Sequence, residues 1–413
     1  MRFFSRKYIF SYLYKLLCKK QIAASYSLSW EQRKLGDVVQ ITMGQSPDGS
    51  TYSDEPSDYI LVQGNADLQN GWVCPRIWTT QITKKADAGD LIMSVRAPAG
   101  AMGKTAYNAV IGRGVAAIKG NEFIYQLLVK MDMDGFWKTL SCGSTFESLN
   151  SDNIKNAEVK VPTTAEQVQI GDFFRHLDNL ITLHQRKYDK LTNVKKSMLE
   201  KMFPKNGSNV PEIRFKGFTE AWEQRKLTEF VEFFSGLTYT PNDVQENGTL
   251  VLRSSNVSNG EVVDADNIYV NPQVVNSENV KVGDIVVVVR NGSRSLIGKH
   301  AQIKAFMPNT VIGAFMTGIR SECPEFTNAL LNTSRFEEEI AMNMGATINQ
   351  ITGYMFSKME FKVPCLDEQK EIGEYFENLD HLITLHQRKL EEMKKQKKAL
   401  MQLLLTGIVR VKA

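Results

Sequence analysis

The sequence predicts an α+β protein with two pseudo-symmetric mixed α/β domains, separated by two long helices that form an antiparallel coiled coil. Three observations predict this fold class: a long helical segment occurs twice, one six-residue motif opens each half of the chain, and strand-like segments recur between them in the same order. A period of about 200 residues is too long for a solenoid and fits a duplicated unit of one domain and one helix.

The duplicated helical segment is the clearest of these observations. Residues 166–187 read EQVQIGDFFRHLDNLITLHQRK and residues 368–389 read EQKEIGEYFENLDHLITLHQRK, and their last eight residues are identical. In both copies the spacing of seven residues recurs along the segment, which is typical of a coiled-coil seam. The predicted seam consists of Ile170, Leu177, His184, Leu191 and Met198 in the first copy and Ile372, Leu379, His386, Met393 and Leu400 in the second.

Each helix should be longer than its own domain is wide. About 38 residues at about 1.5 Å per residue give a little over 50 Å, so most of each helix needs a partner outside its own domain. The other helix is the expected partner; the alternative is two separate amphipathic helices, each lying on its own domain. A linker of about ten residues cannot carry the chain back along the first helix. We therefore expect the second domain at the far end of the first helix, with the second helix returning antiparallel.

The motif Trp-Glu-Gln-Arg-Lys-Leu opens each half, at 30–35 and at 222–227. A β-rich stretch with Gly, Asn, Ser and Pro at its turns follows each copy. Strands are expected at 90–96 and 284–290, followed by Gly103-Lys104 in the first half and Gly298-Lys299 in the second. Each half then has a Val-Ile-Gly segment and a last strand ending in Val-Pro, and Thr164 and Asp367 are the expected N-caps of the helices.

The chain therefore divides into seven expected segments. The first is an atypical N-terminal extension that is basic, aromatic and interrupted by Lys15, whereas a signal peptide needs an uninterrupted apolar core. We expect an upstream extension, or a basic helix lying on the first domain. The segments are the extension (1–29), the first domain (30–164), the first helix (165–204), a linker (205–221), the second domain (222–366), the second helix (367–406) and a C-terminal tail (407–413).

Composition limits the class of protein. A hydrophobic content of 42% and a charged content of 23% are ordinary for a soluble protein. The net charge of +4 is only mildly basic, so any nucleic-acid surface must be local. The five cysteines are scattered without a Cys-x-x-Cys pair, which indicates neither disulfides nor zinc and favours a cytoplasmic protein. The longest apolar run, Ile285–Val289, is too short for a membrane span.

Known catalytic patterns do not fit. Gly103-Lys-Thr105 is similar to the end of a phosphate-binding loop, but Pro98 stands where the first glycine is required. Glu158-x-Lys160 and Glu360-x-Lys362 are similar to nuclease carboxylates, but Asp152 aligns with Tyr354, so no upstream carboxylate is shared by both halves. His184 and His386 are interpreted as a partly buried pair that fixes helix register, in preference to a ligand site.

Binding patterns fit better. Arg, Asn, Gln and Ser side chains occur on Gly-rich loops at strand ends, where Arg can pair with guanine, Asn or Gln with adenine, and hydroxyls with phosphate. The lysine clusters of the two helices are interpreted as solvated helix faces. The candidate DNA-binding residues are Gln45, Ser46, Gln63, Asn65, Arg96, Lys104 and Arg113 in the first half, and Arg253, Ser254, Asn256, Arg290, Asn291, Ser293, Arg294 and Lys299 in the second.

The opening Trp-Glu-Gln-Arg-Lys-Leu motifs, the Val-Pro before each helix and the Leu-Asp-x-Leu-Ile-Thr-Leu-His-Gln-Arg-Lys within it resemble the specificity (S) subunit of bacterial type I restriction–modification enzymes. The resemblance covers residues 30–413. One departure is Gln21–Ser29, which stands where the second half has a family-like lead-in at Val210–Phe218.

The resemblance implies two target-recognition domains, each reading one half of a split double-stranded DNA site. It also implies that the helices dock two methyltransferase (M) subunits, with restriction (R) subunits joining the complex. The chain would then be non-catalytic and hold no cofactor, with S-adenosylmethionine, ATP and Mg in the partner subunits. The alternatives are a coiled-coil assembly or anti-restriction protein that binds M subunits without reading DNA, and a fused methyltransferase–specificity enzyme, which the missing methylation motifs disfavour.

Overall fold

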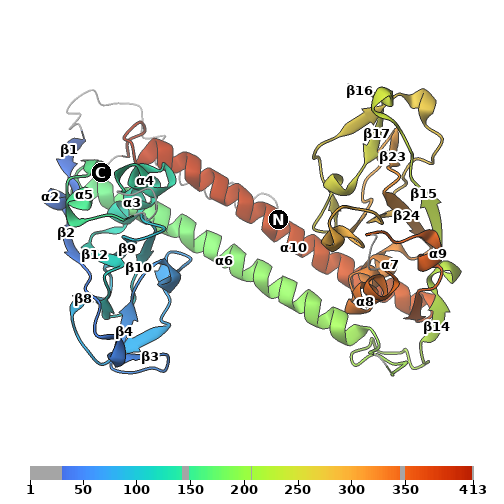
Figure 1. Ribbon diagram of the computed structural model, residues 1–413, viewed down its shortest axis with the longest axis horizontal. Helices are drawn as coiled ribbons and strands as arrows, with labels where there is room; N and C mark the ends of the chain where they lie inside the picture. Colours follow the sequence, from blue (N-terminus) through green and yellow to red (C-terminus); the bar gives the residue numbers. More distant parts are fainter. Residues whose placement is uncertain (1–29, 142–147, 206, 345–348, 412–413) are drawn as a thin grey trace. The chain divides into compact units, whose positions relative to one another are not determined.

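The computed structural model describes residues 30–141, 148–205, 207–344 and 349–411 (Figure 1). The expected N-terminal extension lies outside these residues. Contacts divide the chain into unit 1, which ends at His184 and resumes at Lys389, and unit 2, Gln185–Arg388. Each unit therefore contains one β-rich domain and part of both long helices, whereas the sequence treated each helix as a single segment.

Unit 1 contains sheets of six, five and two strands. The six-stranded sheet has the order β2 (Gln40–Met43), β12 (Val115–Lys119), β9 (Leu91–Ser94), β10 (Met102–Lys104), β6 (Trp72–Val73), β5 (Leu68–Gln69). The five-stranded sheet has the order β3 (Tyr52–Ser53), β7 (Ile77–Thr79), β4 (Tyr59–Val62), β11 (Ala109–Ile111), β8 (Lys84–Ala86), and the third sheet pairs β1 (Glu31–Lys34) with β13 (Glu158–Val161).

The helices of unit 1 pack on its six-stranded sheet around one apolar cluster, and a second cluster, with Val62 and Ile111, joins that sheet to the five-stranded one. Phe123, Leu128 and Trp137 contribute to the first cluster from the domain, together with Ile170 and Phe174 from the start of the first long helix. The helices of this unit's domain are α2 (Leu35–Val38), α3 (Glu122–Met133), α4 (Phe136–Leu140) and α5 (Ser151–Lys155), followed by the first long helix, α6 (Thr164–Met202).

Unit 2 repeats this plan with shorter sheets. One four-stranded sheet has the order β15 (Val231–Ser235), β24 (Met316–Ser321), β21 (Ile285–Val288), β22 (His300–Gln302); the other has the order β16 (Val244–Gln245), β20 (Ile268–Val270), β17 (Thr249–Leu252), β23 (Thr310–Ile312). Two strand pairs complete the unit, β14 (Glu223–Lys226) with β25 (Glu360–Val363) and β18 (Val257–Ser258) with β19 (Glu261–Val262). Its helices are α7 (Pro324–Leu331), α8 (Ser334–Asn343), α9 (Gly353–Phe356) and the second long helix, α10 (Leu366–Leu404).

The repeated opening motif forms the same strand pair in both units. In unit 1, β1 pairs antiparallel with β13, Glu31 opposite Val161; in unit 2, β14 pairs with β25, Glu223 opposite Val363. The motif's tryptophan packs on the helix that follows the sheet, since Trp30 lies 5.7 Å from Phe123 between ring centroids. The first strand of each domain is thereby fastened to the last strand before the long helix.

The repeated Ile-Gly near the start of each long helix has a packing cause. A Cβ added at Gly171 would lie 2.9 Å from the backbone nitrogen of Phe123, and one at Gly373 would lie 2.7 Å from that of Phe326. Only glycine therefore allows α6 and α10 to approach the N-termini of α3 and α7 this closely.

Both long helices start slightly earlier than the sequence predicts. The hydroxyl oxygen of Thr163, not Thr164, caps α6 by accepting from the Glu166 N–H at 3.4 Å. Asp367 lies inside α10, which begins at Leu366. The helices end at Met202 and Leu404, two residues before the expected ends.

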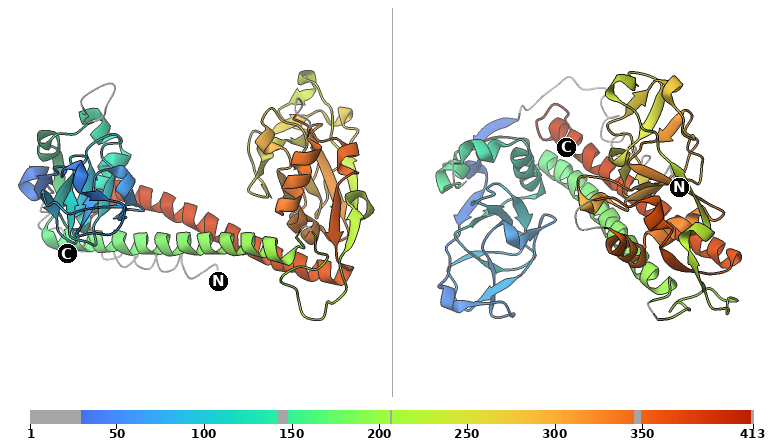
Figure 2. Two further views of the ribbon diagram at one scale, coloured as in Figure 1. Left: turned by 60° about the horizontal axis from the view of Figure 1, so that its bottom comes forward. Right: turned by 45° about the vertical axis from the view of Figure 1, so that its right-hand side comes forward.

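Within each unit, the parts of α6 and α10 run in opposite directions (Figure 2). In unit 1, Asp178 pairs with Lys397 at 2.6 Å and Glu166 with Arg410 at 2.7 Å. In unit 2, the Lys195 ammonium lies 2.6 Å from the Asp380 carboxylate. Asp178 and Asp380 occupy the same position of the repeat, and so do Lys195 and Lys397. The two ion pairs are therefore equivalent, with the roles of the two helices interchanged. The predicted fold class, with its antiparallel helices, is confirmed.

The predicted seam residues are divided between the two domain cores. Ile170 and Leu177 belong to the core of unit 1, and Ile372 and Leu379 to that of unit 2. Met393 and Leu400 pack on unit 1, and Leu191 and Met198 on unit 2, while His184 and His386 are half-buried. The alternative of helices lying on their own domains therefore accounts for the first heptads of each helix. Within the described residues, no helix has the length and apolar content needed to cross a membrane.

Candidate nucleic-acid interface

In unit 1, the candidate residues gather around the turn 112–114 that joins β11 to β12. The Gln45 N–H donates to the Ile111 carbonyl at 2.8 Å, and the Arg113 N–H donates to the Ser46 hydroxyl at 3.2 Å. The Gly114 carbonyl accepts from Val95 at 2.9 Å, which places Arg96 beside the same turn. We call Gln45, Ser46, Gln63, Arg96 and Arg113 the unit 1 turn cluster.

Glycines make this assembly possible. A Cβ at Gly114 would lie 2.0 Å from the Gln63 carbonyl oxygen, and one at Gly44 would lie 2.1 Å from the Gly112 carbonyl oxygen. Within the cluster, Gln45, Arg96 and Arg113 are exposed and Ser46 and Gln63 are half-buried. The turn thus holds two exposed arginines and one exposed glutamine on closely packed backbone.

Asn65 lies in the neighbouring 3-10 turn, η3 (Asn65–Asp67), and is half-buried. The buried Asp67 carboxylate organises this turn, because it accepts from the Gln63 N–H at 2.7 Å, the Gly64 N–H at 3.1 Å and Arg76 Nε at 3.0 Å. Asp67 therefore fixes the backbone that carries Gln63.

Lys104 is not part of the unit 1 turn cluster. Its ammonium lies 3.0 Å from Glu122 and within 4.9 Å of the ring centroids of Trp72 and Tyr125, and its side chain is 15% exposed. This charge is neutralised inside the unit, so we remove Lys104 from the candidate interface. Burial raises the pKa of the Tyr125 hydroxyl, with the Asp178 and Glu122 carboxylates adding to the shift.

The expected match of Gly103-Lys104 with Gly298-Lys299 is wrong. Lys104 lies opposite Leu91 in its sheet, and Gln302 lies opposite Ile285, the residue that corresponds to Leu91. Gln302 also takes the role of Lys104, since its Nε2 donates to Glu325 at 3.3 Å. Lys299 is half-buried in the loop before β22.

In unit 2, candidate residues gather around the equivalent turn 313–315, which joins β23 to β24. The Phe315 carbonyl accepts from Val289 at 3.0 Å and from Arg290 at 3.2 Å. Asn291 Nδ2 donates to the Ser254 hydroxyl at 3.0 Å. Arg290 is exposed, and its guanidinium lies 5.1 Å from the ring centroid of Phe315. We call Ser254, Arg290, Asn291 and Phe315 the unit 2 turn cluster.

Asn256, a candidate DNA-binding residue, does not reach the surface. Its side chain is fully buried, and it accepts from the Arg253 N–H at 3.0 Å and donates to the Ala265 carbonyl at 2.6 Å. It organises a 3-10 turn, η6 (Ser254–Asn256), as Asp67 does in unit 1. Arg253 is half-buried, and its guanidinium pairs with Asp266 at 3.5 Å. Asn256 therefore supports the interface and does not form part of its surface.

Ser293 and Arg294 lie on the loop after Asn291. The Ser293 N–H donates to the Asn291 side-chain oxygen at 3.0 Å, and Arg294 is exposed at the start of η8 (Arg294–Leu296). Sequence reasoning missed Phe315, which is 56% exposed. The sequence indication for it was a large apolar residue two positions after the repeated Val-Ile-Gly, within the turn that Gly313 begins.

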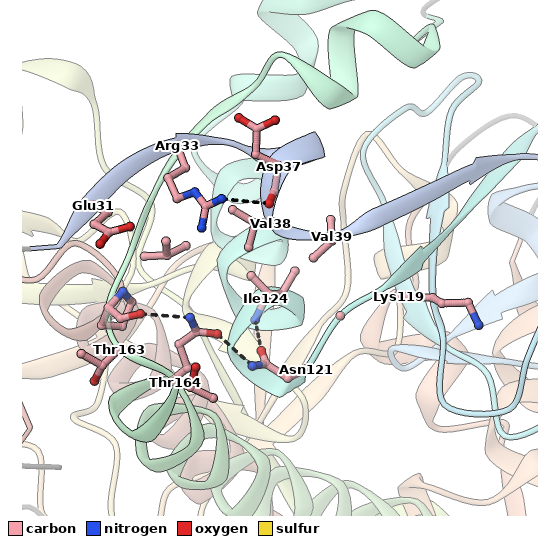
Figure 3. Close-up of a pocket in the computed structure, with 14 residues that line it drawn as sticks. Glu31, Arg33, Asp37, Val38, Val39, Lys119, Asn121, Ile124, Thr163 and Thr164 are labelled. Carbon is pink, nitrogen blue, oxygen red and sulfur yellow. Dashed lines mark hydrogen bonds between the residues drawn. The ribbon is translucent and has the colours of Figure 1, made fainter.

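A cavity of about 460 Å³ lies elsewhere in unit 1, between β1 and the N-termini of α3 and α6 (Figure 3). Several of its polar groups bond to one another: Asn121 Nδ2 donates to Gln167 at 2.9 Å, Gln167 Nε2 to the Pro162 carbonyl at 3.0 Å, and Ile124 N–H to Asn121 at 3.0 Å. None of the candidate DNA-binding residues lines it. Across the described ranges, no group of three or more His, Cys, Asp or Glu residues could hold a metal ion.

Two unlike turn clusters on one repeated frame are what a DNA-specificity protein requires, and comparison with known proteins identifies the class. The chain belongs to the family described as type I restriction modification DNA specificity domain, whose model matches residues 28–193 and 219–395. The predicted family is confirmed.

Two relatives that are distant in sequence are specificity subunits. The chain is 28% identical over 302 residues to the type I restriction enzyme MjaVIII specificity subunit of Methanocaldococcus jannaschii, a match covering 70% of each chain. It is 26% identical over 203 residues to the EcoKI specificity subunit of Escherichia coli, covering 47% of this chain and 43% of that one. The crystal structure of a type I restriction–modification S subunit from M. genitalium superposes with a TM-score of 0.62 at 14% identity, over 93% of this chain and 98% of that chain. This structure shows that the fold is shared.

Proposed function

We propose that this chain is the DNA sequence-specificity subunit of a type I restriction–modification complex, and that each turn cluster reads one half of an asymmetric, bipartite DNA site. One observation carries the proposal: the two units hold the same turn with the same backbone hydrogen bonds and present different side chains on it. Different donors and acceptors on one frame read different base sequences.

The side chains of the clusters suit major-groove edges. Arg96 and Arg113 in unit 1 and Arg290 in unit 2 can each donate two hydrogen bonds to guanine, and Gln45 or Asn291 can pair with adenine. The Ser46 and Ser254 hydroxyls and the exposed turn backbone suit phosphate oxygens. Arg294 is the remaining exposed arginine of the unit 2 loop and would add to phosphate attraction.

Family membership supports docking of M and R subunits, with catalysis and the cofactors S-adenosylmethionine, ATP and Mg assigned to those partners. The helix repeats offer a docking surface in each unit. Leu180 and Leu183 in unit 1 are 41% and 47% exposed, and Leu382 and Leu385 in unit 2 are 41% and 43% exposed. Two matching apolar surfaces fit two copies of one M subunit.

The test is to coexpress the chain with its methyltransferase partner and to map methylated adenines in the DNA. We expect a split site with an unread spacer, in which Arg113→Ala relaxes one half-site and Arg290→Ala the other. Arg175→Ala is the matched control, because Arg175 is exposed on α6 and pairs with Asp172 on the preceding turn of the same helix. DNA binding without sequence selectivity in the presence of the partner would instead support the assembly-protein alternative.

We further propose that the helices set the spacer between the half-sites. One heptad adds about 10 Å of helix, or about three base pairs of duplex. Inserting seven residues after His184 and seven after His386 keeps the helix pairing in register. A methylated site with an unchanged spacer would contradict this role.

A further inference from the structure

Phe315 is the large apolar side chain that the fold of unit 2 leaves at the centre of its turn cluster. The neighbouring residue Met316 is 3% exposed, whereas Phe315 is 56% exposed. The backbone of Phe315 is fixed, because its carbonyl accepts from two successive N–H groups, those of Val289 and Arg290. The ring therefore projects from a rigid support.

Arg290 is held against this ring. Its guanidinium lies 5.1 Å from the ring centroid, and its backbone forms an antiparallel bridge with Gln350. A guanidinium stacked on an aromatic face keeps its donors free at the edge and loses less conformational freedom when it binds. Asn291, the next residue, is tied to Ser254, so Arg290 is oriented on both sides.

Unit 1 cannot place a side chain at this position. The Gly114 carbonyl accepts from Val95 as the Phe315 carbonyl accepts from Val289, so the two residues are equivalent. A Cβ at Gly114 would lie 2.0 Å from the Gln63 carbonyl oxygen. The ring beside the arginine therefore distinguishes unit 2 from unit 1.

We propose that Phe315 is a specificity-determining residue that packs on the 5-methyl group of a thymine, while the arginine stacked on it pairs with the adjacent guanine. This inference rests on the proposed function and names the base chemistry read by unit 2. In the major groove, thymine presents its methyl group and guanine presents the O6 and N7 acceptors. Neighbouring bases lie about 3.4 Å apart along the helix axis, within the span of a stacked ring and guanidinium.

The test uses the complete complex with its methyltransferase partner and a duplex carrying the mapped site. Each thymine of the unit 2 half-site is replaced in turn by deoxyuridine, which lacks the methyl group, and each guanine by 7-deazaguanine, which lacks N7. We expect one deoxyuridine to weaken binding about fourfold for the wild type, the value of one buried methyl group, and to have no effect for Phe315→Ala. The adjacent 7-deazaguanine should weaken binding about tenfold for the wild type and have no effect for Arg290→Ala.

Two variants serve as controls. Phe306→Ala removes a phenylalanine of the same unit that is 80% exposed and should keep the deoxyuridine effect. Phe315→Leu keeps an apolar contact and should retain part of it. Thermal unfolding of Phe315→Ala should match that of the wild type, because more than half of the ring is exposed.

Two results would overturn the inference. One is a deoxyuridine effect that persists in Phe315→Ala, and the other is a wild-type complex that selects its site but responds to no thymine of that half-site. A wild type that binds all sequences equally would instead overturn the proposed function, and this inference with it.

Discussion

Units 1 and 2 build the same turn and place different side chains on it. In unit 1 a Cβ at Gly44 would lie 2.1 Å from the Gly112 carbonyl oxygen, and in unit 2 one at Gly236 would lie 2.1 Å from that of Gly313. The residues that follow differ, with exposed Arg113 in one unit and exposed Phe315 in the other. The comparison teaches that glycines and backbone hydrogen bonds hold the frame, which leaves the exposed positions free to differ in specificity.

The units also share an ion pair between the start of one long helix and a segment that follows the end of the other. A glutamate near the start of each long helix is buried, and an arginine from another segment pairs with it: Arg410 with Glu166 in unit 1 and Arg214 with Glu368 in unit 2. Both arginines approach through two nitrogens, at 2.7–2.8 Å. The glutamate belongs to the repeat, and the arginines share a short apolar-Arg-apolar-Lys pattern, at 213–216 and at 409–412, that follows each long helix.

The largest effect on stability is expected from substitutions that break these ion pairs. Glu368→Gln leaves Arg214, whose side chain is 12% exposed, without its carboxylate, and should destabilise unit 2 by about 3–5 kcal/mol. Glu166→Gln should cost less, because Arg410 is 39% exposed and water can solvate it. Urea unfolding measures both variants, with exposed Glu371→Gln as the control. Equal losses in the two units would contradict this difference in burial.

A smaller effect tests the glycine frame. Gly236→Ala forces a Cβ against the Gly313 carbonyl and should cost about 1–3 kcal/mol of stability. Selectivity for the unit 2 half-site should fall, while the unit 1 half-site is still read. Gly292→Ala is the matched control, because its Cβ would meet no atom within 4 Å. If both variants unfold alike, the close approach does not hold the turn.

A similar effect is expected in binding free energy. Arg290→Ala should cost about 1–3 kcal/mol of specific DNA binding and relax selectivity at one base position. Titration of the complex against a set of single-base variants of the site measures this. A loss that is uniform over all sequences would make Arg290 a phosphate contact.

The smallest expected effect is a dependence of stability on pH in unit 2 that unit 1 does not share. His300 is buried on β22, and burial, followed by the nearby Lys195 charge, lowers its pKa below the ordinary 6.5. The unfolded chain then binds more protons than the folded one below pH 6.5, so the stability of unit 2 is full above that pH and falls as the pH decreases. His300→Gln should remove this decrease in urea unfolding between pH 7.5 and about 5.5. Unit 1 has Met102 at the equivalent strand position and lacks this titration.

Much of the fold could be predicted because the duplication gives the sequence pattern of several strands and of the long helix in two copies. The repeated Trp-Glu-Gln-Arg-Lys-Leu and Val-Pro segments pair with each other in both units, and the long helices lie within two residues of their expected ends. The heptads predicted a helix–helix seam. An apolar stripe on a helix can be buried by a partner helix or by a domain core, and the sequence does not distinguish the two. In the structure, Ile170 and Ile372 lie in domain cores.

The candidate site could be predicted only in part. The sequence predicted these residues on loops at strand ends, but it did not predict that Ser46 would lie beside Arg113 or Ser254 beside Asn291. Asn256 and Lys104 have the composition of a DNA contact, but the same amide can organise a turn and the same ammonium can pair with a buried carboxylate. Strand register places Lys104 opposite Leu91 and Gln302 opposite Ile285, so the Gly-Lys pairs of the two halves are not equivalent although their sequences match.

The most direct test of the central claim, that two unlike domains each read one half of the site, replaces one domain by the other. In the variant, residues 222–363 take the place of residues 30–161, and the methylated DNA is sequenced with the methyltransferase partner present. The account predicts an inverted repeat of the unit 2 half-site, with the original spacer. Methylation of the original asymmetric site by this variant would contradict it.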